Sequence, residues 1–142
     1  MSEPLYIVRP GKPEDINFIL ATFLRGLYYG ESYFSLIPKA IFMSNYKVVA
    51  IALLTRHQVR VACLPDDQDV ILGYSIVSHD HKILHWVQVK QVFRKKGIAR
   101  SLVPKEVKQV SHLTKLGVAL LPKIPNSIFN PFDLTIKETK NV

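Results

Sequence analysis

Three apolar runs lie close together in the middle of the chain, separated only by short polar turns. They cover residues 58–64, 70–78 and 83–89, and the turns between them are residues 65–69 and 79–82. Runs this short, bounded by polar clusters and rich in branched residues, predict β-strands. Strands joined by such short turns pair antiparallel, because a parallel pair needs a crossover of about a dozen residues or more. The middle of the chain therefore predicts an antiparallel sheet.

Helices and further strands are expected on both sides of these runs. Together they predict one mixed, mostly antiparallel sheet with helices on both faces, a mixed α/β (α+β) fold. Before these runs we expect a strand at 5–9, a helix from Pro13 to about Tyr28, an aromatic loop at 28–34 and a helical region from Pro38, with a candidate break at Asn45-Tyr46. After them we expect a helix at 99–110 that Pro104 kinks or shortens, a strand at 111–116 and a short helix at 118–121.

The length and composition predict a single domain over residues 1–134, followed by a frayed tail at 135–142. No apolar run approaches the roughly 20 residues that span a bilayer, so we expect no membrane segment and, by default, a cytoplasmic protein. The single cysteine, Cys63, excludes an internal disulfide and a cysteine metal cluster. His79 and His81 flank Asp80, but a hairpin turn explains them better than a metal site.

A basic turn follows the third run and leads into the next expected helix. Its residues are Arg94-Lys95-Lys96-Gly97-Ile98-Ala99. At the start of a helix, backbone N–H groups point outward, the helix dipole adds partial positive charge, and glycine allows a ligand to approach the main chain. This stretch therefore predicts an anion site.

The formal net charge of +8 is concentrated near the C-terminal end. Residues 90–142 carry eleven Lys and Arg against three Asp and Glu, which equals the whole excess. A basic third of this kind favours a polyanionic partner, either the phosphates of a cofactor or a nucleic acid. A solvated face explains most of the individual lysines equally well.

The order of elements, together with Arg94-x-x-Gly97-x-Ala99 placed after a strand that ends at Val89, resembles the GNAT superfamily of acyl-CoA-dependent acyltransferases. The motif occupies residues 83–102, and the element order extends the resemblance over nearly the whole chain. The strand LHWVQVK and the segment NSIFNPF also resemble, more loosely, small GNAT-like proteins of tailed phages.

The resemblance implies a CoA site, most simply for acetyl-CoA, and transfer of its acyl group directly to an amine. It places the pyrophosphate on backbone amides of the signature loop, with the Arg94 side chain bracing the loop. It also places the pantetheine arm along the main chain near Val89, beside a splay between the fourth and fifth strands. The cofactor-binding residues it implies are Val89, Arg94, Lys95, Gly97, Ile98, Ala99, Arg100 and Ser101.

His85 is the candidate catalytic base. By strand alternation it is expected on the same face as Val87 and Val89, and an imidazole with its usual pKa near ~6.5 suits proton removal from an amine. A half-buried histidine bonded to a carbonyl is the equally weighted alternative. Two features common in the family are missing, since Ile83 replaces a strand glutamate and no tyrosine follows Tyr74. Water, Ser127 or Ser111 are the candidate substitutes for a general acid.

The aromatic loop is the candidate acceptor site, with Tyr28, Tyr29 and Tyr33 as its binding residues, although the same aromatics could simply cover the core. Two alternatives to an N-acyltransferase remain open at this point. One is a protein of the same fold that modifies or binds nucleic acid through the basic third, and the other is a CoA-binding module that has lost catalysis. The sequence allows a monomer or a homodimer.

Overall fold

A six-stranded sheet forms the centre of the protein, as a computed structural model shows for residues 5–94, 96–112 and 128–131. The strands lie in sequence order, and the first four pair antiparallel, as their short turns predict. The last two strands are only two residues each and run parallel to their neighbours. The strands are β1 (Ile7–Pro10), β2 (Gln58–Cys63), β3 (Ile71–Val77), β4 (Ile83–Val89), β5 (Gln109–Val110) and β6 (Ile128–Phe129).

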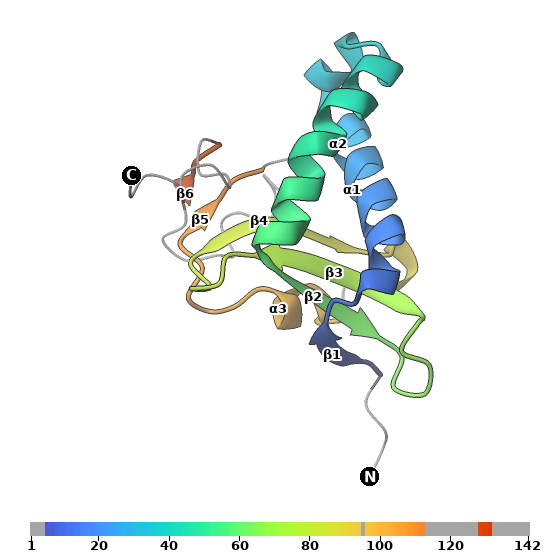
Figure 1. Cartoon of the computed structure of the whole chain (residues 1–142). Coiled ribbons are helices and arrows are strands. Elements are labelled where there is room, and N and C mark those ends of the chain that lie inside the picture. The colour runs from blue at the N-terminus through green and yellow to red at the C-terminus, as the bar shows by residue number, and fades with distance from the viewer. Residues whose placement is uncertain (1–4, 95, 113–127, 132–142) are drawn as a thin grey trace.

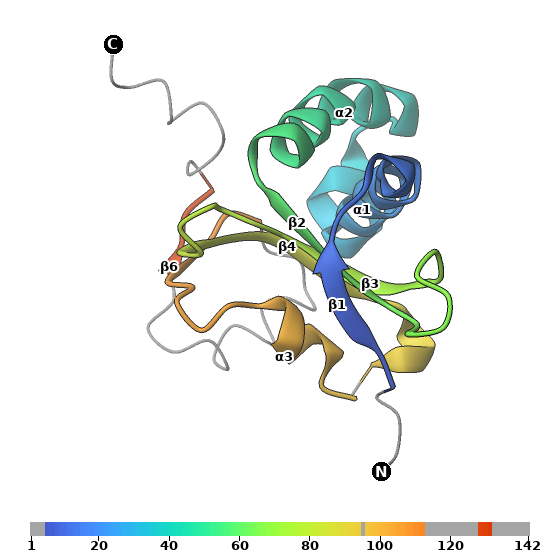
Figure 2. The ribbon, with the colours of Figure 1, turned by 60° about the horizontal axis from the view of Figure 1, so that its bottom comes forward.

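Helices cover both faces of this sheet, which confirms the predicted layering. The long helices α1 (Ile16–Gly30) and α2 (Lys39–Arg56) lie side by side on one face, and α3 (Ile98–Leu102) lies on the other (Figures 1 and 2). Three 3-10 turns connect the elements: η1 (Pro13–Asp15), η2 (Ser32–Leu36) and η3 (Gln91–Phe93). No helix in the described part of the chain combines the length and the apolar character needed to cross a membrane.

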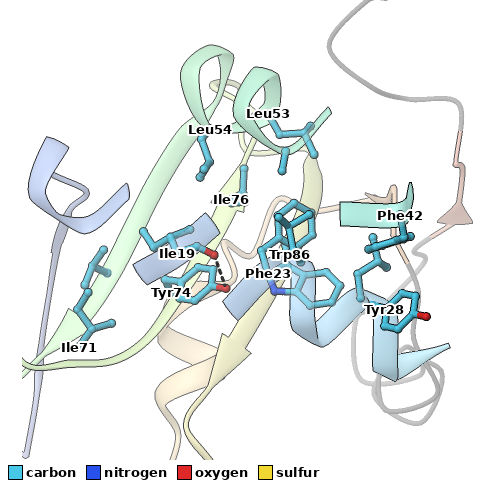
Figure 3. Close-up of a cluster of buried hydrophobic side chains, with 14 of the residues drawn as sticks. Ile19, Phe23, Tyr28, Phe42, Leu53, Leu54, Ile71, Tyr74, Ile76 and Trp86 are labelled. Carbon is cyan, nitrogen blue, oxygen red and sulfur yellow. Dashed lines mark hydrogen bonds between the residues drawn. The ribbon is translucent and has the colours of Figure 1, made fainter. Parts of the chain in front are cut away.

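The main core fills the space between the sheet and the α1–α2 layer (Figure 3). Phe23 of α1 lies with its ring centroid 4.8 Å from that of Trp86 in β4. Tyr74 of β3 is 1% exposed, and its hydroxyl reaches the carbonyl oxygen of Ile19 at 3.3 Å. Burial raises the pKa of Tyr74, so this phenol stays neutral and acts in the fold as a hydrogen-bonded core residue.

Smaller clusters pack on the α3 side of the sheet. Ile98 and Leu102 of α3 are almost fully buried against Leu72 and Val89. The Ser75 hydroxyl donates to the carbonyl oxygen of Leu102 at 2.8 Å, which fixes the end of α3 on the sheet. The start of α3 is therefore held rigidly beside the end of β4.

The N-terminal strand is held by a buried ion pair. Arg9 donates to both carboxylate oxygens of Asp15, at 2.8 and 3.0 Å, and also to the carbonyl oxygen of Gln68 at 2.8 Å. Burial would raise the pKa of Asp15, but hydrogen bonds from Arg9 and from the amide of Lys12 lower it overall. This pair joins β1, η1 and the β2–β3 turn.

Several expected boundaries were wrong. The helix predicted at 99–110 is shortened, as Pro104 suggested, and ends at Leu102. A short strand forms earlier than expected, at Gln109–Val110, and residues 113–116 of the strand predicted at 111–116 lie outside the described residues. Helix α1 extends to Gly30, into the predicted aromatic loop, and α2 is unbroken because the Asn45 side chain donates to the helix carbonyl of Ile41. The expected helix at 118–121 and tail at 135–142 lie outside the described residues.

Candidate functional site

The end of β4 is fixed by its close contact with β3. A Cβ atom added to Gly73 would lie 2.7 Å from the carbonyl oxygen of Gln88, so only glycine fits there. The amide of Lys90 donates to the carbonyl oxygen of Leu72 at 2.9 Å. Gly73 therefore marks a close approach of two backbones, a common reason for a glycine inside a strand.

The other edge of β4 is paired with a described strand only near its start. Its pairing with β5 is limited to Ile83 and Leu84, followed by one hydrogen bond from the amide of Ser111 to the carbonyl oxygen of Leu84. From His85 to Val89, no other described strand pairs with this edge. A splay between the fourth and fifth strands at this edge is what the sequence resemblance implies.

The basic loop follows directly and is braced as expected. Arg94 Nε donates to the carbonyl oxygen of Val89 at 3.1 Å, which ties the loop back to the end of β4. Lys95 lies outside the described residues. Lys96 and Arg100 are exposed on either side of Gly97, so the loop carries several cations near one backbone turn.

Gly97 occupies the position that begins α3, with a left-handed φ of 82°. A side chain is disfavoured there by its backbone conformation. No atom lies within 4 Å of where a Cβ would be, so this side of the turn is open to a ligand. The next amides, of Ile98, Ala99 and Arg100, belong to the first turn of a helix and have no partner within it.

Ser101 differs from the other residues predicted in this loop. Its amide donates to the carbonyl oxygen of Gly97 at 3.2 Å, and its hydroxyl is hydrogen-bonded to the hydroxyl of Tyr6. The Tyr6 hydroxyl also reaches the carbonyl oxygen of Gly97 at 3.3 Å. Ser101 therefore stabilises the loop through its own contacts, with Tyr6 as a partner that the sequence did not indicate.

The predicted orientation of His85 was wrong. The β3–β4 register shifts between Ile76 and Val77, and His85 is the extra residue of a bulge in β4. Leu84 and Val87 both pack on the α3 side, although they are three residues apart. His85 instead contacts His57, the residue that caps the end of α2, with ring centroids 4.2 Å apart. The bulge thus places His85 on the face opposite Val87 and Val89.

A chain of buried polar groups begins at His85. Its Nδ1 lies 2.6 Å from the hydroxyl of Ser111, and that hydroxyl lies 2.8 Å from Nδ1 of His112. Nε2 of His112 is hydrogen-bonded to the hydroxyl of Tyr46 in α2. Ser111 is one of the expected substitutes for a general acid, whereas Ser127 lies outside the described residues.

The chain can be hydrogen-bonded in either of two directions. In one, Tyr46 donates to His112, His112 to Ser111, and Ser111 to His85. In the other, every donor and acceptor is exchanged, because each imidazole has one N–H and one acceptor nitrogen when neutral. Switching between the two moves a proton from one end to the other without leaving a charge inside.

Burial strongly favours the neutral imidazoles. It lowers the pKa of His85 from 6.5 to about 3, and the neighbouring His57 and His112 act in the same direction. Burial also lowers the pKa of His112 to about 4. Among the described residues, Nε2 of His85 has no hydrogen-bond partner. His85 therefore presents a neutral nitrogen for one further hydrogen bond.

The sequence did not indicate His57, His112 or Tyr46, which come from distant parts of the chain with no shared motif. No group of three or more His, Cys, Asp or Glu side chains in the described ranges is arranged to hold a metal ion.

The predicted acceptor tyrosines have different environments. Tyr28 is buried in α1, and its hydroxyl donates to the carbonyl oxygen of Ile37 at 2.8 Å. Tyr29 is 62% exposed, with the ammonium of Lys39 5.5 Å from its ring centroid. The side chain of Tyr33 is outside the described part of the structure. Of the two described tyrosines, only Tyr29 is open to solvent.

No protein-family model matches this chain, and no curated protein sequence matches it. Several solved structures are similar to this chain. A predicted acetyltransferase of Clostridium acetobutylicum, solved with acetyl-CoA, is 12% identical over 94% of this chain and 97% of its own, with a TM-score of 0.55. A GCN5-related N-acetyltransferase of Rhodopseudomonas palustris is 15% identical, with coverages of 99% and 82% and a TM-score of 0.50.

YjaB from Escherichia coli, solved without ligand, is 16% identical over 70% of this chain and 63% of YjaB, again with a TM-score of 0.50. At these low identities, the TM-scores of 0.50 to 0.55 show a shared arrangement of sheet and helices.

Proposed function

Because the chain has the fold of the GNAT superfamily, we propose that it is an acyl-CoA-dependent N-acyltransferase that moves an acetyl group from acetyl-CoA directly to an amine. One observation carries the proposal: Gly97 begins α3 in a left-handed conformation, facing open space, beside exposed cations. Such a turn suits the pyrophosphate of CoA, since backbone amides and positive charge converge on one anion.

The loop residues would divide the work of holding the cofactor. The amides of Ile98, Ala99 and Arg100 would bind phosphate oxygens, with Lys95 adding to the positive charge. Arg94 would brace the loop, as its bond to Val89 already does. Ser101 would act indirectly, through Gly97 and Tyr6. The edge of β4 that pairs with no described strand, up to Val89, would receive the pantetheine arm. The bound cofactor would supply the activated acetyl thioester.

His85 would accept the proton of the attacking amine at Nε2 once neighbouring side chains move to expose this atom, because the imidazole is 1% exposed in the structure. A full positive charge on this imidazole is unfavourable, because burial holds its pKa at about 3. The chain through Ser111 and His112 removes that difficulty. As Nε2 gains a proton, Nδ1 passes one to Ser111 and Ser111 passes its own to His112. His112 would pass one to Tyr46, whose own hydroxyl proton would leave to solvent. The amine loses its proton, and His85 stays neutral.

The acceptor would be an extended amine that contacts the α1–α2 connection and reaches His85 with its amino group. Tyr29 lies beside the first residue of α2, Lys39, whereas His85 lies beside the residue that caps the other end of this helix. Tyr29 is the predicted tyrosine whose ring is exposed at the connection, and it could pack against an apolar part of the acceptor. Tyr28 would support this region from below, because it is buried and bonded to Ile37. Tyr33 remains part of the proposed acceptor region.

The decisive test is calorimetric titration of the protein with acetyl-CoA and, in parallel, free CoA. We expect saturable one-to-one binding, and we expect Gly97→Glu to weaken it about tenfold or more, since the change adds bulk and negative charge to the phosphate site. Val92→Glu is the matched control, because Val92 is 75% exposed in the neighbouring η3 and makes no part of the proposed site. Wild-type affinity in the Gly97 variant would refute the assignment.

A second candidate function is binding or modification of nucleic acid. The basic third of the chain favours it, and Lys82, Lys90, Lys105 and Lys108 are exposed in addition to the loop cations. Non-specific binding to a phosphate backbone weakens steeply as salt rises. If neither CoA compound binds and DNA binds with such a salt dependence, the second function replaces the first. If CoA binds but no amine is acetylated, the protein is a CoA-binding module.

A further inference from the structure

The outer face of α2 exposes a stripe of apolar side chains. Ile41, Val48 and Ile51 are 54%, 70% and 41% exposed. Their spacings of seven and three residues place them on one side of a helix. A helix that is apolar on both its inner and outer sides is normally covered on both. Figure 2 shows the inner side on the sheet and no element of the described chain over the outer side.

The polar side chains along this stripe add little hydrophilic surface, because they are hydrogen-bonded to the backbone of their own helix. The hydroxyls of Ser44 and Thr55 donate to the carbonyl oxygens of Ile41 and Ile51, at 3.2 and 3.0 Å. The Asn45 amide likewise donates to the carbonyl oxygen of Ile41, at 2.8 Å. Side chains that bond to their own helix leave fewer polar atoms for water. We call this face, from Ile41 to Thr55, the α2 stripe.

An apolar groove adjoins the α2 stripe, between α2 and α1. It has a volume of about 540 Å³ and is lined on the α1 side by Leu20, Ala21 and Leu24. From α2 it takes Ala40, Met43, Ser44 and Lys47, so Ser44 belongs to both the groove and the stripe. The two features therefore form one continuous surface.

All the charges on this pair of helices are positive. Helices α1 and α2 contain Arg25, Lys39, Lys47 and Arg56 and no aspartate or glutamate. All four cations are exposed, and Lys47 lies at the groove itself. An apolar surface bordered only by cations is complementary to an apolar surface bordered by carboxylates.

We propose that the α2 stripe and its groove bind an amphipathic helix of a partner protein, with apolar residues on one side and acidic residues along its edges. A row of side chains spaced three and four residues apart would fill the groove and cover the stripe. Its carboxylates would then lie beside the cations of α1 and α2. This surface is separate from the proposed CoA loop, which lies at the opposite face of the sheet beside α3 (Figure 2).

Two other occupants fit less well. A second copy of the chain would bring the cations of two α2 helices together without any acidic residue on either helix. A membrane surface could attract the cations, but it offers no ridge that would fill a groove between two helices. An acidic amphipathic helix satisfies the shape and the charge together.

The test uses the full chain and a fluorescein-labelled synthetic peptide as long as α2, 18 residues. The peptide has leucine at every third or fourth position, glutamate beside the leucines and alanine elsewhere. We expect saturable binding in fluorescence anisotropy that weakens as salt rises. A second peptide with lysine replacing each glutamate should not bind. Val48→Glu should weaken binding of the glutamate peptide about tenfold or more, and Val92→Glu should leave it unchanged.

A charge reversal provides an independent variant. Lys47→Glu should weaken binding of the glutamate peptide and strengthen binding of the lysine peptide. A folding defect would not change the two affinities in opposite directions. Circular dichroism should show wild-type helix content in every variant.

The proposal is overturned if the two peptides bind alike, if neither binds, or if Val48→Glu binds as wild type does. It is also overturned if sedimentation shows a dimer that Val48→Glu dissociates, which would assign the surface to a second copy. Capture on phosphatidylserine vesicles that depends on Val48, without peptide binding, would assign it to a membrane. None of these results depends on CoA binding.

Discussion

At the scale of single residues, His85 has the most unusual environment among the described histidines. It is 1% exposed, lies against the tilted ring of His57 and is bonded to Ser111, and burial lowers its pKa to about 3. An imidazole of this kind costs free energy when protonated. The fold therefore keeps a neutral histidine where the proposed chemistry needs a proton to pass.

We predict that His85 and His112 make the protein less stable as the pH falls from about 6.5 to about 4. In the unfolded chain both imidazoles take up protons near pH 6.5, whereas in the folded chain their pKa values are about 3 and about 4. The unfolded state then binds more protons, so the free energy of unfolding decreases by about 1.4 kcal/mol per pH unit for each such group. Urea unfolding at several pH values measures this slope.

The matched variant is His85→Asn, whose side-chain amide can still bond Ser111 but does not titrate. Between pH 6.5 and pH 4, we expect the free energy of unfolding of this variant to fall less steeply with decreasing pH than that of the wild type. The difference should be about 1.4 kcal/mol per pH unit, the contribution of one titrating group. Equal slopes in the two proteins would mean that His85 is not held neutral in the fold.

His85 also shows what the sequence could and could not predict at this scale. Its place on a central strand followed from the apolar pattern, which is local. Its orientation did not, because a bulge arises from how β4 pairs with β3 and leaves no mark in the sequence of β4. Tyr46 and His112 were missed for the same reason, since only the tertiary fold brings them to Ser111.

At the scale of elements, the loop from Arg94 to α3 was predictable because its signals are local: a strand end, a cluster of cations and a glycine. The structure has that glycine at the start of the helix, with the left-handed φ that favours it. The length of α3 was less predictable. Its periodic apolar residues continue to Val107, but Pro104 ends the helix and leaves Val107 to pack in a separate cluster.

The contact between β3 and β4 predicts a sensitive position at Gly73. We expect Gly73→Ala to destabilise the protein by roughly 1–3 kcal/mol, because the added methyl would lie 2.7 Å from the backbone oxygen of Gln88 and must push the strands apart. Chemical denaturation would measure the loss.

Gly97→Ala is the informative comparison for this element. The added methyl would have no atom within 4 Å, so the expected loss of stability, about 1 kcal/mol, comes only from the left-handed backbone conformation. If Gly73→Ala were no more destabilising than Gly97→Ala, the close packing of β3 on β4 would be wrong.

At the scale of the whole molecule, the order of strands and the two helical layers followed from the sequence, because short polar turns leave the strands few ways to pair. The connection between the N-terminal strand and the rest of the sheet did not. Besides its pairing with β2, the strand is held by Arg9, which reaches both Asp15 and the carbonyl oxygen of Gln68, far along the chain. No periodicity indicates such a contact.

We expect Asp15→Asn to destabilise the whole fold by about 3–5 kcal/mol, because it leaves the buried guanidinium of Arg9 without its carboxylate. Thermal unfolding followed by circular dichroism would report it. The control is Asp69→Asn, which removes only an exposed contact of 3.7 Å with Lys12 and should change stability by less than about 1 kcal/mol. Similar losses in both variants would show that the buried pair does not hold β1 in place.

The bulge in β4 also bears on how a protein of this kind can change over evolutionary time. In a regular strand, losing or gaining one residue turns every following side chain to the other face. In β4 the extra residue is already present, and His85 occupies it. Deleting one residue here would restore regular alternation and leave Leu84 and Val87 on their present side. A deletion at this position would thus remove the histidine and the bulge together and preserve the sheet, whereas a substitution would keep the bulge.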